Sequence, residues 1–171
     1  MAVLEIVDRC LAPERDVIMN YSGPDPWGVA KKISGSIREY FHVSASGTSQ
    51  TIVNWDISGD PIKFYSTWWV RKKFSRFSVM KVDILVQGTK SKTTNRGDFR
   101  LLLRGDLETK FEGNNIFLKT VWVLYSYLFY NRTRRAFIES CRDAIIGFRN
   151  EIKEHFNLKT GPTEFLRGGT G

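Results

Sequence analysis

The sequence predicts an α+β protein in which a long C-terminal helix lies across a long, curved antiparallel sheet of about six strands. Between residues 50 and 112, four segments alternate apolar and polar residues with a period of two. This pattern is typical of antiparallel strands with one buried and one solvated face. The segment Ile116–Phe156 has no proline and only one glycine, which favours a helix. The two kinds of element bury their apolar surfaces when the helix packs on the sheet.

The first 41 residues predict two strands and a helix. Ala2–Cys10 and Asp16–Tyr21 have strand patterns and are separated by a turn-rich linker. Asp25 is expected to cap a helix over Pro26–Phe41, because proline suits the first helical position. The apolar face of this helix comprises Ala30, Ile33, Ile37 and Phe41. It is the only helix expected before the main strands.

The segment Ile116–Phe156 changes character along its length. Its first half is apolar nearly all round, whereas its second half is apolar on one stripe only. At 100° per residue the stripes of both halves align, so one continuous helix is consistent, and a kink at Asn131 stays open. A second stripe on the first half needs a partner, which is the small helix, a ligand or another subunit. This second stripe consists of Phe117, Val121, Leu124 and Leu128.

The length predicts one domain over residues 1–159, followed by a glycine-rich C-terminal tail, 160–171, that is expected to be flexible. The N-terminus lacks the pattern of a signal peptide. The longest apolar run, about 15 residues, is too short to span a bilayer. Cys10 and Cys141 are expected to be separate buried thiols in a reducing, cytoplasmic setting.

This order of elements resembles the START/Bet v1-like helix-grip (SRPBCC-like) fold over roughly residues 1–157. The resemblance rests on element order, and no motif carries it. The chain departs from the family pattern, because two strands precede one helix where the family has one strand and two helices. It also shows six predicted strands instead of seven. The resemblance implies a C-terminal helix that closes a sheet-lined cavity.

Catalytic and metal-binding signatures are missing from the sequence. His42 and His155 have no cysteine or carboxylate at metal-ligand spacing, and Cys141 lies on an apolar stripe. Neither a P-loop nor a dinucleotide-binding glycine motif occurs. No cofactor, metal or catalytic residue is therefore assigned. An enzyme of helix-grip type, a cyclase or hydrolase, remains a third hypothesis.

Aromatic residues of the helix and sheet suggest a cavity for an apolar ligand. The alternatives are ordinary core packing and a homodimer interface through the aromatic helix. The first hypothesis is therefore a non-catalytic carrier that holds an apolar small molecule or lipid between sheet and helix. The predicted cavity residues are Trp55, Trp68, Phe117, Val121, Trp122 and Tyr125.

The net charge of +8 is concentrated in the strands. Residues 61–110 carry 12 Lys/Arg against four acidic residues, and the rest of the chain is balanced. Basic and aromatic side chains on one sheet face suit nucleic acid or an anionic membrane surface, which is the second hypothesis. A solvated face with cross-strand ion pairs is the alternative. The predicted anion-binding residues are Tyr65, Trp69, Arg71, Lys73, Lys81, Arg100 and Arg104.

Overall fold

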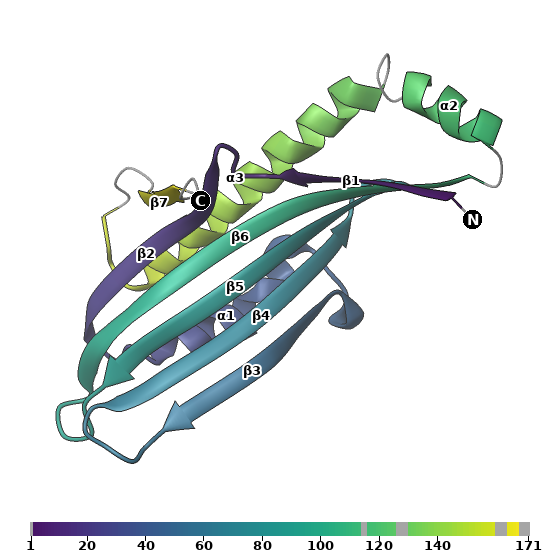
Figure 1. The fold of residues 1–171 in the computed structure, drawn as a ribbon. Helices are drawn as coiled ribbons and strands as arrows, with labels where there is room; N and C mark the ends of the chain where they lie inside the picture. The colour runs from purple at the N-terminus through teal and green to yellow at the C-terminus, as the bar shows by residue number, and fades with distance from the viewer. Residues whose placement is uncertain (1, 114–115, 126–129, 160–163, 168–171) are drawn as a thin grey trace.

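The computed structural model describes residues 2–113, 116–125, 130–159 and 164–167. Its elements, in chain order, are β1 (Ala2–Arg9), β2 (Glu14–Pro24), α1 (Gly28–Phe41), the 3₁₀ turn η1 (Ala45–Gly47), β3 (Thr48–Asp56), β4 (Ile62–Lys73), β5 (Ser78–Lys90), β6 (Arg96–Gly113), α2 (Ile116–Tyr125), α3 (Asn131–His155) and β7 (Glu164–Arg167). The predicted α+β class is confirmed, with a long C-terminal helix on an antiparallel sheet (Figure 1).

The sheet is organised around β6. Its strand order is β3-β4-β5-β6-β2-β7, and β1 also pairs with β6. Residues 106–113 of β6 pair with β1, whereas residues 96–103 pair with β2. The two N-terminal strands therefore run end to end along one edge of β6 and act as a single interrupted strand. This explains why the sequence shows two strands before the first helix.

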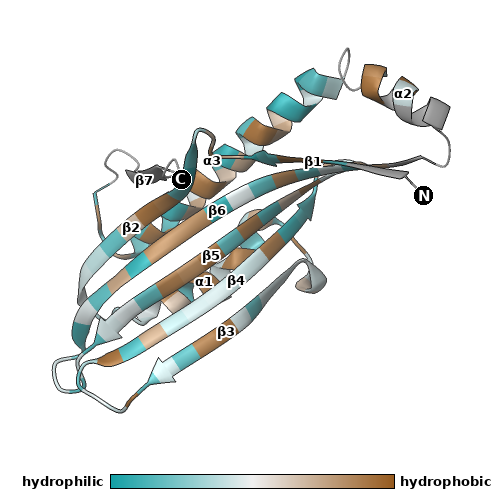
Figure 2. Ribbon diagram, in the orientation of Figure 1, coloured by the Kyte–Doolittle hydropathy of each residue, from teal (hydrophilic) through white to brown (hydrophobic). Residues whose placement is uncertain are grey.

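Both α1 and α3 lie on one face of the sheet, behind the strands in the view of Figure 1. The inward side chains of the strands form one core with these helices. Figure 2 shows hydrophobic and hydrophilic residues interspersed along the same strands. Val82, Leu101 and Ile145 are fully buried in this core. Burial of such side chains contributes about 1.5–3 kcal/mol each, so the sheet and helices stabilise one another.

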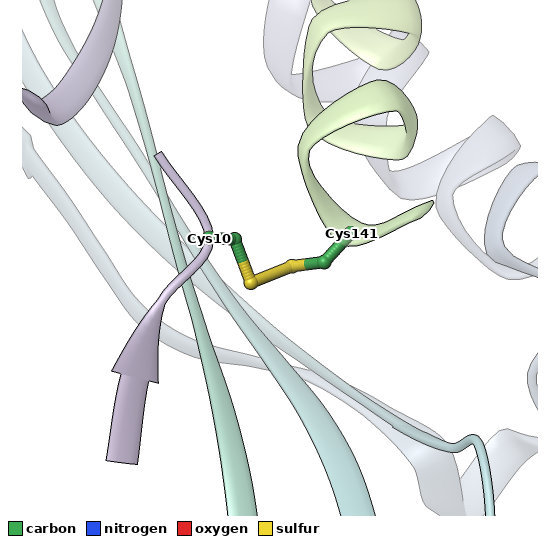
Figure 3. The surroundings of a disulfide bond; sticks show 2 residues. All are labelled: Cys10 and Cys141. Atoms are coloured by element: carbon green, nitrogen blue, oxygen red, sulfur yellow. A yellow bond between two sulfur atoms is a disulfide. The ribbon is translucent and has the colours of Figure 1, made fainter. Parts of the chain in front are cut away.

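A disulfide joins Cys10, just after β1, to Cys141 on α3, with a Cα–Cα distance of 5.7 Å (Figure 3). The prediction of two separate thiols is therefore wrong, because residues 131 positions apart in sequence meet in the core. Gly105 of β6 makes the close approach feasible. A Cβ there would clash with Ile145 Cδ1 and would lie 3.2 Å from Cys141 Sγ. Whether the protein is cytoplasmic stays a prediction.

The predicted helix over residues 116–156 is present as two described helices, α2 and α3, which point in different directions in Figure 1. Residues 126–129, which fall within the predicted helix between α2 and α3, lie outside the described part. Tyr130, at the start of α3, is buried and its hydroxyl lies 2.6 Å from Ser78 Oγ. This contact ties the start of α3 to the sheet, so helical periodicity alone was insufficient to define the direction of the chain.

Three smaller features differ from the sequence predictions or qualify them. Asp25 does not cap α1, since the N-cap is Trp27 and no side chain caps the helix. Within the predicted tail, Glu164–Arg167 forms β7 and pairs with β2, which makes a seventh strand. Among the described residues, no helix combines the length and apolar character needed to cross a bilayer.

Candidate anion-binding surface

The outer face of the sheet is the side turned away from α1 and α3, and it carries the predicted anion-binding residues. On β4, Phe64, Trp68 and Val70 are buried in the core, so the residues between them point outward. The same alternation holds along β5 and β6. All seven predicted residues therefore share the outer face: Tyr65, Trp69, Arg71, Lys73, Lys81, Arg100 and Arg104.

The strand register distributes these residues over the face and does not gather them into one cluster. Arg71 lies directly opposite Lys81 at one end of the sheet. Tyr65 and Arg100 lie toward the other end, where both are register partners of Gln87. The sequence could assign the face but not this separation, because period-2 alternation contains no information about register.

The middle of the outer face is neutralised by ion pairs. Arg104 Nε donates to Asp16 Oδ1 at 2.8 Å, and this hydrogen bond raises the pKa of Arg104. Asp16 is buried, so its carboxylate is committed to this partner. For Arg104, cross-strand ion pairing is therefore better supported than binding of an external anion.

Arg71, on the same face, contacts an aromatic ring. Its guanidinium carbon lies 5.2 Å from the ring centroid of Trp69, within the range of a cation–π contact.

A basic hollow of about 830 Å³ lies at the end of the sheet where β4 finishes and β5 begins. The loop after α1 closes one side of it. It combines five Lys/Arg side chains with a single carboxylate, that of Glu108. The lining residues are His42, Val43, Ser44, Ser46, Gly47, Arg71, Lys72, Lys73, Val79, Lys81, Glu108 and Lys110.

Glu108 engages two of the five cations. Its carboxylate lies 2.6 Å from Lys81 Nζ and 2.8 Å from Lys110 Nζ. The hydrogen bond with the Glu5 carboxyl, followed by those from Lys110 and Lys81, lowers the pKa of Glu108 to about 2. Glu108 is therefore ionised at neutral pH and holds both lysines.

Arg71, Lys72 and Lys73 carry the unbalanced charge of the basic hollow. In the described part of the chain, no carboxylate forms an ion pair with any of them. The register also places Arg71 opposite Lys81, and like charges directly opposite each other destabilise a sheet. Such an arrangement is suited to receive an anion that relieves the repulsion.

Two of the five basic residues of the basic hollow, Lys72 and Lys110, were missing from the sequence prediction. Lys110 has the same strand parity as Arg104 and Glu108, so the alternation along β6 was a sufficient signal for it. Lys72 has the parity of the buried residues of β4, and strand alternation assigned it to the core face. It reaches the hollow because β4 ends at the next residue.

The predicted cavity residues lie in different places. Trp68 is buried and its Nε1 donates to Ser34 Oγ at 3.2 Å. Trp55 packs edge-on against Trp27, with ring centroids 4.6 Å apart. Val121 and Tyr125 are exposed on α2, which contacts the β1 and β6 end of the sheet. The side chains of Phe117 and Trp122 lie outside the described part.

Comparisons with known proteins leave the chain without an assigned family. No family model matches it, and no curated protein matches it significantly. A structural match to the Mll3558 protein from Rhizobium loti covers 84% of this chain and 99% of that protein at 11% sequence identity. Its TM-score is 0.16, so it carries no argument about fold or function.

Proposed function

We propose that the protein binds anionic membrane surfaces through the basic hollow. The observation that carries this proposal is the set Arg71, Lys72 and Lys73, which form no ion pair with the described carboxylates. Each basic residue near an anionic lipid surface contributes about 1 kcal/mol. Three such residues are therefore sufficient for weak, reversible attachment.

Helix α2 favours a membrane over a nucleic acid as the partner. It begins three residues after the end of β6, the strand that supplies Glu108 and Lys110 to the basic hollow. Figure 1 shows α2 beyond the main body of the molecule, and Figure 2 shows its hydrophobic segments. Leu124 is 60% exposed and Val121 is 48% exposed. A protein that presents both exposed apolar side chains and a basic cluster is suited to the interfacial region of an anionic bilayer.

Vesicle flotation with the full chain tests the proposal. Vesicles of phosphatidylcholine with and without phosphatidylserine should be compared for the wild type and the triple variant R71E/K72E/K73E. Binding to the anionic vesicles should fall by a hundredfold or more, in line with about 1 kcal/mol per charge and the added repulsion. Neutral vesicles should bind weakly in both cases.

A matched control separates a local site from the total charge. The variant K31E/R38E/K159E changes three exposed cations elsewhere and carries the same net charge as the triple variant. It should retain most of the binding. Equal losses in both variants, or tighter binding to single-stranded RNA than to vesicles, would overturn the membrane proposal. The RNA result would indicate that the partner of the basic hollow is a nucleic acid.

Attachment by α2 has its own test within this proposal. Leu124→Asp should weaken binding to anionic vesicles several-fold, because a charge at this position opposes burial in the interface. Leu124→Met is the matched apolar control and should bind like the wild type. Equal binding of both variants would remove α2 from the proposal and leave the basic hollow alone.

The carrier hypothesis and membership of the helix-grip family stay predictions. Trp55 and Trp68 pack against other described core residues, so no particular observation favours a ligand between helices and sheet. Native mass spectrometry of the purified protein would reveal a retained lipid-sized molecule. A spectrum of the bare chain alone would count against the carrier hypothesis.

A further inference from the structure

A second depression, of about 930 Å³, opens on the outer face at the end of the sheet opposite the basic hollow. One cross-strand row of polar side chains crosses it. Neighbours in this row are direct register partners from β3 to β2. We call it the polar depression and define it by Asn54, Tyr65, Gln87, Arg100 and Asn20.

Arg100 is the unusual member of this row. Its Nε is covered by neighbouring atoms and has no hydrogen-bond partner among the described residues. No described carboxylate forms an ion pair with it. An N–H group that is shielded from solvent and has no hydrogen-bond acceptor destabilises the folded protein. The terminal nitrogens of Arg100, which are not covered in this way, are available to a ligand in the depression.

The carboxylates at the rim are engaged with other partners. Asp98 accepts a hydrogen bond from Thr89 Oγ1 at 2.5 Å. Asp56 accepts one from Ser58 Oγ at 2.6 Å. Lys63, which also lines the depression, is the register partner of Asp56. Arg100 is therefore the basic group of the polar depression that no carboxylate faces across the strands.

An apolar row separates Arg100 from the ion pairs in the middle of the face. Leu85, Leu102 and Ile18 are successive register partners on β5, β6 and β2. They lie between the row of Arg100 and that of Arg104, one outward position further along each strand. Outward positions on a strand are about 7 Å apart, so the carboxylate of Asp16 stays with Arg104.

We propose that the polar depression binds a small organic molecule that carries one carboxylate and several hydroxyl groups, as a sugar acid does. Arg100 pairs with the carboxylate through its planar donors. The amides of Asn20, Asn54 and Gln87 supply donors and acceptors for hydroxyl groups, and none of them makes a side-chain hydrogen bond within the described chain. The ring of Tyr65 offers a flat apolar surface to a sugar ring.

Isothermal titration with D-glucuronate and D-glucose tests this assignment, because the two share a ring and differ in the carboxylate. Glucuronate should bind the full chain with a millimolar or lower Kd, and glucose should bind at least tenfold more weakly. The Arg100→Gln variant should lose at least tenfold in glucuronate affinity. The Nε–H resonance of Arg100 should shift during titration of the wild type.

Control variants keep the test independent of folding. Lys31→Gln, on α1, removes one exposed charge elsewhere and should bind glucuronate like the wild type. Gln87→Ala keeps Arg100 and should weaken glucuronate and glucose by a similar factor, because it removes hydroxyl contacts only. Absence of glucuronate binding at millimolar concentration, equal affinities for the two sugars, or full affinity in Arg100→Gln would overturn the proposal. A vesicle-binding defect in R71E/K72E/K73E with intact glucuronate binding would show that the two sites are separate.

Discussion

The two ends of the outer sheet face differ in how their charges are compensated, although they belong to the same strands. In the basic hollow, Arg71 lies opposite Lys81, and five cations surround the single carboxylate of Glu108. In the polar depression, Arg100 lies between the amides of Gln87 and Asn20. The first end is a cluster of like charges, and the second presents one guanidinium among neutral amides, with Lys63, Asp56 and Asp98 at the rim.

This difference shows that partner geometry decides what a charged sheet face can bind. A cluster of like charges attracts an extended anionic surface, and its binding depends on the number of charges in the cluster. A single guanidinium among amides recognises one carboxylate, and its binding depends on hydrogen-bond geometry. Arg104 lies between the two ends, and its ion pair with Asp16 already neutralises it, so it contributes to neither site.

The largest expected effect tests whether the two ends share one scaffold. Replacing Cys10 and Cys141 by serine should lower the free energy of unfolding by about 3 kcal/mol, because the disulfide restricts a long loop in the unfolded chain. Denaturant unfolding followed by circular dichroism and tryptophan fluorescence should still give one transition. Each single variant, Cys10→Ser or Cys141→Ser, should equal the double variant. Separate transitions for the two probes would mean that the ends do not belong to one cooperative unit.

The next effect concerns the carboxylate of the basic hollow. Glu108→Gln removes two ion pairs and should lower the free energy of unfolding by about 2 kcal/mol. The same change should strengthen binding to anionic vesicles several-fold, because Lys81 loses its counter-charge and Lys110 keeps only Glu5, at 3.5 Å. Glu39→Gln, on the exposed side of α1, is the control with the same change in charge. Weaker vesicle binding by Glu108→Gln would contradict the assigned role of the basic hollow.

Ionic strength should distinguish the two ends. Raising the salt concentration from about 0.1 M to about 1 M shortens the Debye length from about 10 Å to about 3 Å. Vesicle binding should fall at least tenfold, because several exposed charges act together, whereas glucuronate binding should fall about twofold. Flotation and titration calorimetry at both concentrations provide the measurement. Parallel losses would remove the distinction between a charge cluster and a hydrogen-bonded site.

Acid should produce the smallest effect and act on the basic hollow. The pKa of Glu108 is lowered to about 2 in the folded protein, below its ordinary value of 4.5. Its stabilising contribution is therefore fully present above pH 4.5 and is lost as the pH falls toward about 2. The stability difference between wild type and Glu108→Gln should shrink by about 1 kcal/mol over this range. A difference that stays constant would show that Glu108 titrates normally.

The period-2 pattern was sufficient to predict the strands and their faces. It assigned Phe64 and Trp68 to the core and Tyr65, Trp69 and Arg71 to the outer face, where the structure has them. Hydrophobic burial produces this pattern directly, because alternate side chains of a strand point to opposite sides. The α+β class follows from the same local property.

Only the tertiary structure decided which residues meet. The Cys10–Cys141 disulfide, the pairing of β7 with β2 and the division of the C-terminal segment into α2 and α3 all depend on contacts between distant parts of the chain. The strand register, which places Arg71 opposite Lys81 and Gln87 opposite Arg100, also depends on contacts between distant parts of the chain. Local periodicity is unchanged when a strand slides by two residues, whereas the set of neighbours is replaced. The sequence by itself therefore determined the basic outer face, and the packing of the strands determined its division into a basic hollow and a polar depression.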